Sequence, residues 1–259
     1  MNRRLNRRQA LAGFGTMSLG AVLAACGGGS DDAPAPSPEA NSEFDDAASC
    51  EATAELTEGP YYFDADALRS DIREDRPGLA LKLGIRVRTT GECAPIKDAV
   101  VDIWHCDAGG VYSGFEAQST GAGGQPPEGG PPPGGGGQPP EGGGQSSRSD
   151  DERYLRGTQV TNAEGIAEFT TIYPGWYRGR TVHIHAKVHL DKQTVLTTQL
   201  FFDEAVTERV YQRTPYSTHS GRDMLNDQDG IFDAALVMTV REDGDGYRAL
   251  MTFDVNAAA

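Results

Sequence analysis

Hydrophobic and polar residues alternate through much of the chain after residue 80, with the two-residue period of a β-strand. The clearest run, Leu81 to Arg88, has Leu, Leu, Ile and Val at every second position and Lys, Gly, Arg and Arg between them, which predicts a half-buried strand. Further strands are predicted in apolar, β-branched runs bounded by turn-forming residues: Val100–His105, Ile166–Tyr173, Val182–Leu190, Val195–Phe202, Ala235–Val240 and Tyr247–Val255.

These strands predict the fold class. About seven strands separated by turn signals favour an all-β domain, a two-sheet β-sandwich core with long functional loops at its rim and few short helices. Residues 203–212 are the clearest candidate helix, long enough for about two turns.

One segment rich in glycine and proline interrupts the pattern. The sequence GGQPPEGG occurs at residues 123–130 and again at 136–143, within a run from Ala122 to Ser147 that has no aromatic residue and no aliphatic side chain larger than Ala. Such a composition cannot bury a core, so we expect a disordered surface insert at about residues 117–149. A mobile lid or a polyproline-like docking segment is the alternative.

The first 49 residues have the composition of an export signal followed by a tether. Paired arginines at residues 3–4 and 7–8 precede an uncharged stretch, which ends in the sequence Leu23-Ala24-Ala25-Cys26. This resembles a twin-arginine signal joined to a bacterial lipoprotein cleavage site, so residues 1–25 are expected to be removed and Cys26 to be lipidated. An uncleaved membrane anchor is the alternative.

Residues 26–49 are rich in Gly, Ala, Pro, Ser and acidic residues, which predicts a flexible tether before a folded domain at residues 50–259. The signal predicts export through the twin-arginine route to the periplasm or the cell surface, with the membrane contacted only through the lipid anchor.

Three cysteines remain after the anchor, and an oxidising compartment favours one disulfide and one free thiol. Cys93 and Cys106 flank a predicted strand and lie too far apart along it to bridge directly. A disulfide between Cys50 and one of the other two is therefore favoured.

The chain is strongly acidic, with 23 Lys and Arg against 38 Asp and Glu and a net charge of −15. Such a surface repels phosphate backbones and argues against a nucleic-acid partner. A small organic substrate with little or no charge suits it better.

Side chains suited to chemistry gather in the segment YPGWYRGRTVHIHAKVHL, residues 173–190. His183 and His185 are two apart on a predicted strand, so both imidazoles point to one face, which suits two neighbouring ligands of one metal ion. The alternative is a pair of histidines on a solvated strand. Turns at residues 174–175 and 179 can bring Tyr177 and Arg180 back towards the histidines. Tyr112 follows another strand and a Gly-Gly turn, and its spacing alone assigns it no role.

Six segments together resemble the intradiol ring-cleavage dioxygenases, and in particular their exported, single-domain branch. They are LTEGPYY (56–62), DIREDRPGLALKL (71–83), VDIWHCDAGGVYS (101–113), RGTQVTNAEG (156–165), YPGWYRGRTVHIH (173–185) and TTQLFF (197–202). The resemblance runs from about residue 50 to the C-terminus, apart from the Gly/Pro insert.

The resemblance implies a non-haem Fe(III) ion held by two tyrosinates and two histidines. Position by position, these ligands are Tyr112, Tyr177, His183 and His185. Phenolate oxygens are hard anionic donors, and with imidazoles they favour trivalent iron.

The resemblance further implies catalytic roles for Arg180, for Gln199 and for Tyr177 as a proton acceptor. It assigns Gly59, Pro60 and Tyr61 to the pocket that holds the substrate ring. Trp104 and His105 are expected only to pack at the end of a buried strand.

The implied activity is cleavage of a catechol-type diol by dioxygen to a muconate-type diacid. A monomer is expected, because the chain has only a tether where cytoplasmic members carry a dimerisation region. Two other hypotheses remain: a cell-envelope aromatic- or glycan-binding sandwich module without turnover, and a structural or adhesion protein that docks through the Gly/Pro insert. The sequence does not rank catechol, hydroxyquinol and protocatechuate as substrates.

Overall fold

The alternating segments of the sequence form two sheets. The computed structural model describes residues 44, 50–65, 67–119 and 146–256. The expected signal, Cys26, most of the expected tether and the repeats of the insert lie outside these residues.

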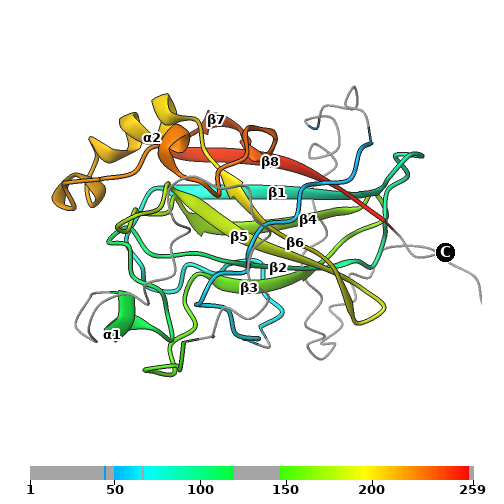
Figure 1. The fold of residues 1–259 in the computed structure, drawn as a ribbon, viewed down its shortest axis with the longest axis horizontal. Coiled ribbons are helices and arrows are strands. Elements are labelled where there is room, and N and C mark those ends of the chain that lie inside the picture. The colour runs from blue at the N-terminus through cyan, green and yellow to red at the C-terminus, as the bar shows by residue number, and fades with distance from the viewer. Residues whose placement is uncertain (1–43, 45–49, 66, 120–145, 257–259) are drawn as a thin grey trace, which may run out of the picture. The chain divides into compact units, whose positions relative to one another are not determined.

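The described residues form eight strands in two four-stranded sheets (Figure 1). The first sheet has the order β4-β1-β8-β7, and its strands are Ile166–Ile172, Ala80–Thr89, Gly246–Val255 and Thr239–Asp243. The second has the order β3-β2-β5-β6, and its strands are Arg156–Val160, Val100–Trp104, His183–Leu190 and Gln193–Phe201. Neighbouring strands are antiparallel except for β1 and β8, which are parallel.

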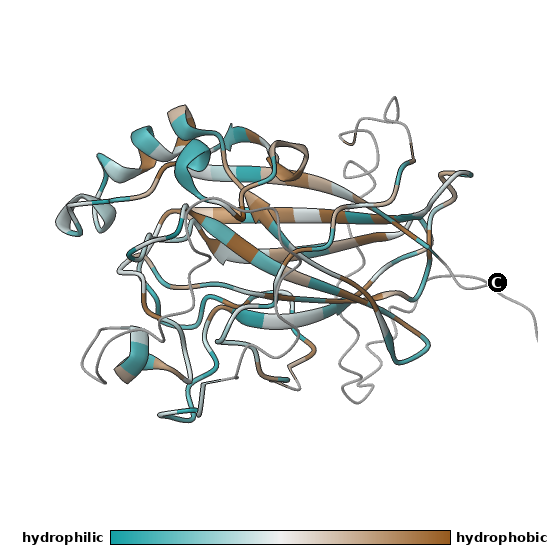
Figure 2. Ribbon diagram, viewed as in Figure 1, coloured by the Kyte–Doolittle hydropathy of each residue, from teal (hydrophilic) through white to brown (hydrophobic). Residues whose placement is uncertain are grey.

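Apolar side chains from one face of each sheet meet in a shared core. Leu83 and Val87 of β1 belong to the same buried cluster as Ile103 of β2 and Val188 of β5, and each is at most 1% exposed. Hydrophobic residues accordingly lie along the strands of both sheets (Figure 2). The prediction of an all-β, two-sheet sandwich is confirmed.

Strand β1 is more buried than the alternation predicts. Its polar side is also covered from Gly84 to Arg88, and the Phe44 ring lies against Gly84 and Arg86 on that side. There the guanidinium of Arg88 forms a buried ion pair with Asp254 of β8, with an N–O distance of 2.9 Å. Burial of a paired charge on the second face therefore replaces the expected exposure.

Two strand assignments differ from the sequence analysis. The predicted strand at residues 235–240 is wrong in its first half, because Ala234–Leu236 form a 3-10 helix, η4, and β7 begins only at Thr239. The Asp233 carboxylate accepts a hydrogen bond from the backbone N–H of Ala235 and so starts the helical turn. Strand β3, RGTQV, was not predicted as a strand, since it lacks an apolar alternation.

Helices are short, as expected. The predicted helix is present as α2, Glu204–Tyr211, and the Asp203 side chain accepts hydrogen bonds from the N–H groups of its first turn. Helix α1, Glu116–Ser119, lies at the start of the expected insert. At the far margin, the Ser149 N–H donates to the Gly114 carbonyl at 2.8 Å. No helix among the described residues has the length and apolar character needed to cross a membrane.

A disulfide joins Cys50 to Cys93, with a Cα–Cα distance of 5.4 Å, and Cys106 is free and buried. This confirms that Cys50 pairs with one of the other two cysteines. The bridge ties the start of the domain to the turn that follows β1, where the Gly91 N–H also donates to the Cys50 carbonyl at 2.9 Å.

Replacing Cys93 by Ser should lower the free energy of unfolding by about 2–4 kcal/mol, because the bridge restricts a loop of intermediate length in the unfolded chain. Denaturant titrations with and without reductant measure this. Wild type should lose stability in reductant, Cys93→Ser should be insensitive to it, and a Cys106→Ala control should keep the wild-type sensitivity. Equal stability of wild type and Cys93→Ser under oxidising conditions would contradict the role of the bridge.

Candidate active site

Tyr112 is placed by a tight turn after β2. The Asp107 carboxylate accepts hydrogen bonds from the N–H groups of Gly109 (2.8 Å) and Val111 (3.0 Å). Gly110 has a φ of +86°, and a Cβ there would lie 2.3 Å from the carbonyl oxygen of Trp176. Only glycine leaves room for this close contact between the two backbone segments. Tyr112, two residues later, is fully buried.

Tyr177 comes from a second turn that fits into the first. The Gly175 N–H donates to the Asp107 carbonyl at 3.0 Å, and a Cβ on Gly175 would lie 2.5 Å from that same oxygen. The two turns therefore touch backbone to backbone. Their contact brings the Tyr112 and Tyr177 rings to a centroid distance of 5.6 Å.

The two histidines extend from β5 on the face opposite the shared core, and each is 2% exposed. His183 donates through Nδ1 to the Thr181 carbonyl at 2.6 Å, which leaves its Nε2 with a free lone pair. The His185 ring stacks on Trp104, with centroids 4.9 Å apart and planes 5° apart. Trp104 thus packs directly on one histidine of the site, in addition to its expected place at a buried strand end.

The four predicted ligands converge around one point. His183 Nε2 lies 3.1 Å from His185 Nε2, 3.2 Å from the Tyr177 hydroxyl and 3.4 Å from the Tyr112 hydroxyl. Two imidazole nitrogens and two phenol oxygens are the donor set expected for a hard trivalent ion such as Fe(III), so the side chains fit that metal. Among the described residues no group of three or more His, Cys, Asp or Glu side chains is arranged to hold a metal ion, so metal binding by these two histidines would depend on the two phenols.

Burial keeps all four groups uncharged when no cation is present. It raises the pKa of Tyr112 well above its usual value and raises the pKa of Tyr177 to about 12, although the Arg180 charge opposes the latter shift. Burial also lowers the pKa of His183 and of His185. The imidazoles therefore keep their lone pairs, whereas the phenols give up their protons only to a strong positive charge.

Arg180 and Gln199 lie beside this group and bind each other. Arg180 Nη2 donates to Gln199 Oε1 at 2.7 Å, and Gln199 Nε2 donates to the Thr57 carbonyl at 2.8 Å. Gln199 of β6 is the cross-strand partner of His185. Arg180 Nε donates to Asp229 at 2.9 Å, and the resulting ion pair is largely buried.

The residues after Cys50, blue in Figure 1, form a strap that we define as residues 53–62 and that crosses the second sheet. Its backbone bonds β6, where the Leu56 N–H donates to the Thr197 carbonyl at 2.9 Å. A Cβ on Gly59 would lie 3.1 Å from Cε1 of His185, and the Tyr61 ring lies 4.8 Å from that of Tyr112. The structure thus brings Gly59 and Tyr61 against the four-ligand group, with Pro60 between them in the chain.

Lys187 anchors the strap. Its ammonium forms an ion pair with Glu58 and lies 3.7 Å from the centroid of the Tyr62 ring. Tyr62 in turn packs on Trp104, with ring centroids 4.7 Å apart. These contacts lie on both sides of the Gly59–Tyr61 segment along the chain and fix it in place.

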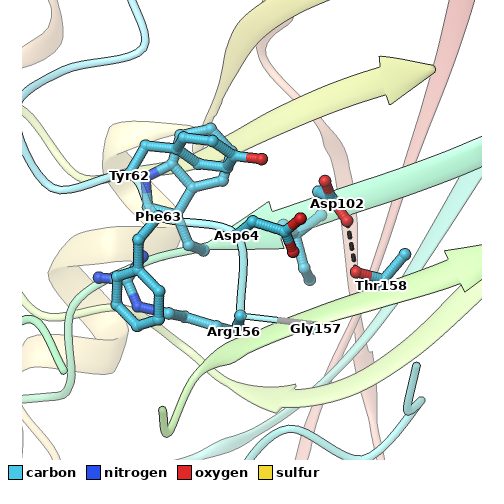
Figure 3. Close-up of a pocket in the computed structure, with 10 residues that line it drawn as sticks. Tyr62, Phe63, Asp64, Asp102, Arg156, Gly157 and Thr158 are labelled. Atoms are coloured by element: carbon cyan, nitrogen blue, oxygen red, sulfur yellow. Dashed lines mark hydrogen bonds between the residues drawn. The ribbon is translucent and has the colours of Figure 1, made fainter. Parts of the chain in front are cut away.

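Residues 62–65 line a pocket together with residues of β2 and β3 (Figure 3). Figure 3 shows Asp64 pointing towards Asp102 of β2, which is hydrogen-bonded to Thr158 of β3. Trp104 separates this pocket from His185.

Sequence reasoning missed several residues that hold the site together: Glu58, Thr181, Lys187 and Asp229. Lys187 was within reach, since it lies two residues after His185 and so shares its face. Asp229 lies in an irregular loop 49 residues after Arg180, and no periodic signal links the two.

Comparison with solved structures finds related proteins. An intradiol ring-cleavage dioxygenase from Tetranychus urticae is 32% identical, with a TM-score of 0.68, and the match covers 80% of this chain and 95% of that one. The dioxygenase domain of a dioxygenase carbohydrate-binding protein fusion from the cellulolytic bacterium Streptomyces sp. SirexAA-E is 28% identical, with a TM-score of 0.54, and the match covers 80% of this chain and 100% of that one. Hydroxyquinol 1,2-dioxygenase from Pseudomonas putida DLL-E4, at 16% identity and a TM-score of 0.53, shares the fold, and the match covers 82% of this chain and 69% of that one. No family model and no curated protein matches the chain.

Replacing Lys187 by Met keeps the length of the side chain but removes the ammonium from Glu58 and Tyr62, so the strap should open more often. Hydrogen exchange should become about tenfold faster at the Leu56 and Gly59 amides, as expected for the loss of a charged contact. Lys192→Met, at an exposed lysine of the β5–β6 turn, is the matched control. Equal exchange in the two variants would show that Lys187 does not hold the strap.

Proposed function

Because this chain belongs to the intradiol ring-cleavage dioxygenase family and is therefore an oxidoreductase, we propose that it cleaves a catechol-type diol between its two hydroxyl-bearing carbons. The reaction consumes dioxygen and yields a muconate-type diacid. The observation that carries the proposal is the meeting of two phenols and two imidazoles around one point beside a buried guanidinium.

Tyr112, Tyr177, His183 and His185 would hold a non-haem Fe(III) ion. When bound, the ion withdraws electron density from the two catechol oxygens and makes the ring reactive towards dioxygen. Two phenolates would balance much of its charge in a site from which water is largely excluded. The stacking of Trp104 on His185 and the bond from His183 to Thr181 would keep both imidazoles in the orientation of ligands.

Tyr177 is suited to move a proton. Burial raises the pKa of Tyr177 to about 12, so as a phenolate it would be a strong acceptor for the proton of a catechol hydroxyl. It is less buried than Tyr112, whose side chain is fully enclosed and suited to stay in place.

Arg180 would stabilise negative charge on the substrate oxygens and on the ring as dioxygen attacks. Its planar, permanently charged group is held at Nε by Asp229 and at Nη2 by Gln199, so little reorganisation is needed during the reaction. Gln199 orients Arg180 and binds the strap through the Thr57 carbonyl. Gly59, Pro60 and Tyr61 would then form the wall against which the ring packs.

We further propose that the enzyme works outside the cytoplasm as a monomer, lipid-anchored at Cys26 after export through the twin-arginine route. The disulfide between Cys50 and Cys93 supports an oxidising compartment. Plant-derived or lignin-derived catechols are substrates that such a location makes accessible, and the net charge of −15 argues against nucleic acid as a partner.

The test is metal analysis of the purified protein together with oxygen-uptake assays on catechol, hydroxyquinol and protocatechuate. We expect one iron per chain, visible absorption from tyrosinate-to-iron charge transfer, and uptake with at least one of these diols. Stoichiometric iron without uptake on any catechol would instead favour a binding module and overturn the proposed reaction.

Single substitutions test the residues. Tyr177→Phe should shift or bleach the colour and lower turnover by about 10²-fold or more, because a proton acceptor is lost. His183→Ala should lose the iron. Tyr211→Phe is the matched control, since its hydroxyl bonds the Pro174 carbonyl outside the ligand group. Full activity in Tyr177→Phe or retained iron in His183→Ala would refute the assignment.

A further inference from the structure

Asp229 directly follows the 3-10 helix η3 (Asn226–Gln228), and its carboxylate contacts the residues that precede β5. Its side chain is 3% exposed. One oxygen, Oδ2, accepts hydrogen bonds from both Arg180 Nε and the backbone N–H of Thr181, each at 2.9 Å. The other oxygen, Oδ1, accepts from the backbone N–H of Ile231 at 2.9 Å. A single buried carboxylate thus accepts hydrogen bonds from two consecutive residues, Arg180 and Thr181, just before the strand that carries the histidines.

The first of these contacts sets the direction of the guanidinium. Arg180 is bound on two sides, by Asp229 at Nε and by Gln199 at Nη2, so the plane of its guanidinium group cannot turn without breaking a charge-assisted hydrogen bond.

The second contact reaches a predicted metal ligand through one residue. Thr181 donates its N–H to Asp229, while its carbonyl accepts the Nδ1–H of His183 at 2.6 Å. That bond fixes which nitrogen of His183 carries the proton and therefore directs Nε2 towards the other ligands. Asp229 therefore contacts Arg180 directly and His183 through Thr181.

Other bonds hold the loop in place without this carboxylate. The Asn226 side chain donates to the Phe202 carbonyl at 2.8 Å, and its backbone N–H donates to Glu204 at 2.7 Å. Arg222 pairs with Glu204 and also donates to the Thr181 hydroxyl. A substitution that keeps the shape of Asp229 should therefore leave the loop docked while altering what the carboxylate orients.

We propose that Asp229 is a positioning residue that couples Arg180 to His183, orienting the guanidinium directly and the histidine through the backbone of Thr181. The catalytic meaning of this coupling rests on the proposed function. The geometry of the coupling is independent of that function and can be measured in the metal-free protein.

The variant is Asp229→Asn, which keeps the shape but replaces one acceptor oxygen by an NH₂ donor and removes the charge. In metal-free protein labelled with ¹⁵N in arginine and histidine, the Arg180 Nε–H resonance should lose its protection from exchange. His183, held as the Nδ1–H tautomer in wild type, should become a mixture of tautomers. Asp223→Asn is the matched control, because Asp223 bonds the Gly179 N–H at 3.1 Å in the same turn without contacting Arg180.

In the iron-loaded enzyme, Asp229→Asn should lower kcat by about 10- to 100-fold, the usual cost of removing a partner that orients a ligand, with a smaller change in KM. A double-mutant cycle separates this from general damage. If Asp229 acts through Arg180, adding Asp229→Asn to Arg180→Gln should lower kcat by less than the single substitution does in wild type.

Wild-type Arg180 and His183 resonances in Asp229→Asn, or fully multiplicative losses in the cycle, would overturn the proposal. Should Asp229→Asn fail to fold, Asp229→Glu keeps the charge but shifts the oxygen, and wild-type resonances in that variant would overturn the proposal equally. An inactive, iron-free wild type would refute the proposed function alone, because the metal-free resonances still report on Asp229.

Discussion

The turn at residues 107–111 and the turn at residues 174–177 touch so closely that neither Gly110 nor Gly175 has room for a Cβ. Each turn belongs to a different part of the chain, and each delivers one phenol, Tyr112 or Tyr177. The contact is between backbones, so it fixes the points at which the two tyrosine side chains leave the main chain. The rest of the site uses this fixed pair: β5 supplies the histidines, and the strap closes over them by packing Gly59 on His185.

Burial then determines the chemistry. Removing two phenols and two imidazoles from water favours their neutral forms, so a strong cation at their centre is the natural partner for the donor set. The charges nearby are fixed and paired, as Arg180 is with Asp229 and Lys187 is with Glu58. These partly buried pairs stabilise the fold little by themselves, because desolvation offsets much of their attraction. Their main effect is on orientation. The pair of Arg180 with Asp229 orients the guanidinium beside the ligands, and the pair of Lys187 with Glu58 holds the strap in place.

The sequence alone predicted the sandwich and most strands, because alternation of apolar residues reports directly on a sheet that buries one face. It failed where another interaction determined the structure: the Asp233 cap turned residues 234–236 into a helix, and β3 forms without an apolar pattern. The resemblance to a family supplied the four ligands, and the structure brings them together, whereas the spacing of His183 and His185 alone pointed only to a shared face. Asp229 and Glu58 could not have been found, since their partners are distant in sequence and reached through irregular loops.

The central claim is that two phenols and two imidazoles from distant segments hold one ferric ion. Resonance Raman spectroscopy of the iron-loaded protein, excited in its visible band, tests this most directly, because it reports only vibrations of groups bonded to the coloured centre. We expect tyrosinate modes in wild type, weakened in Tyr112→Phe and in Tyr177→Phe and absent when both are replaced. A coloured iron protein without tyrosinate modes, or with the same modes in both single variants, would contradict the account.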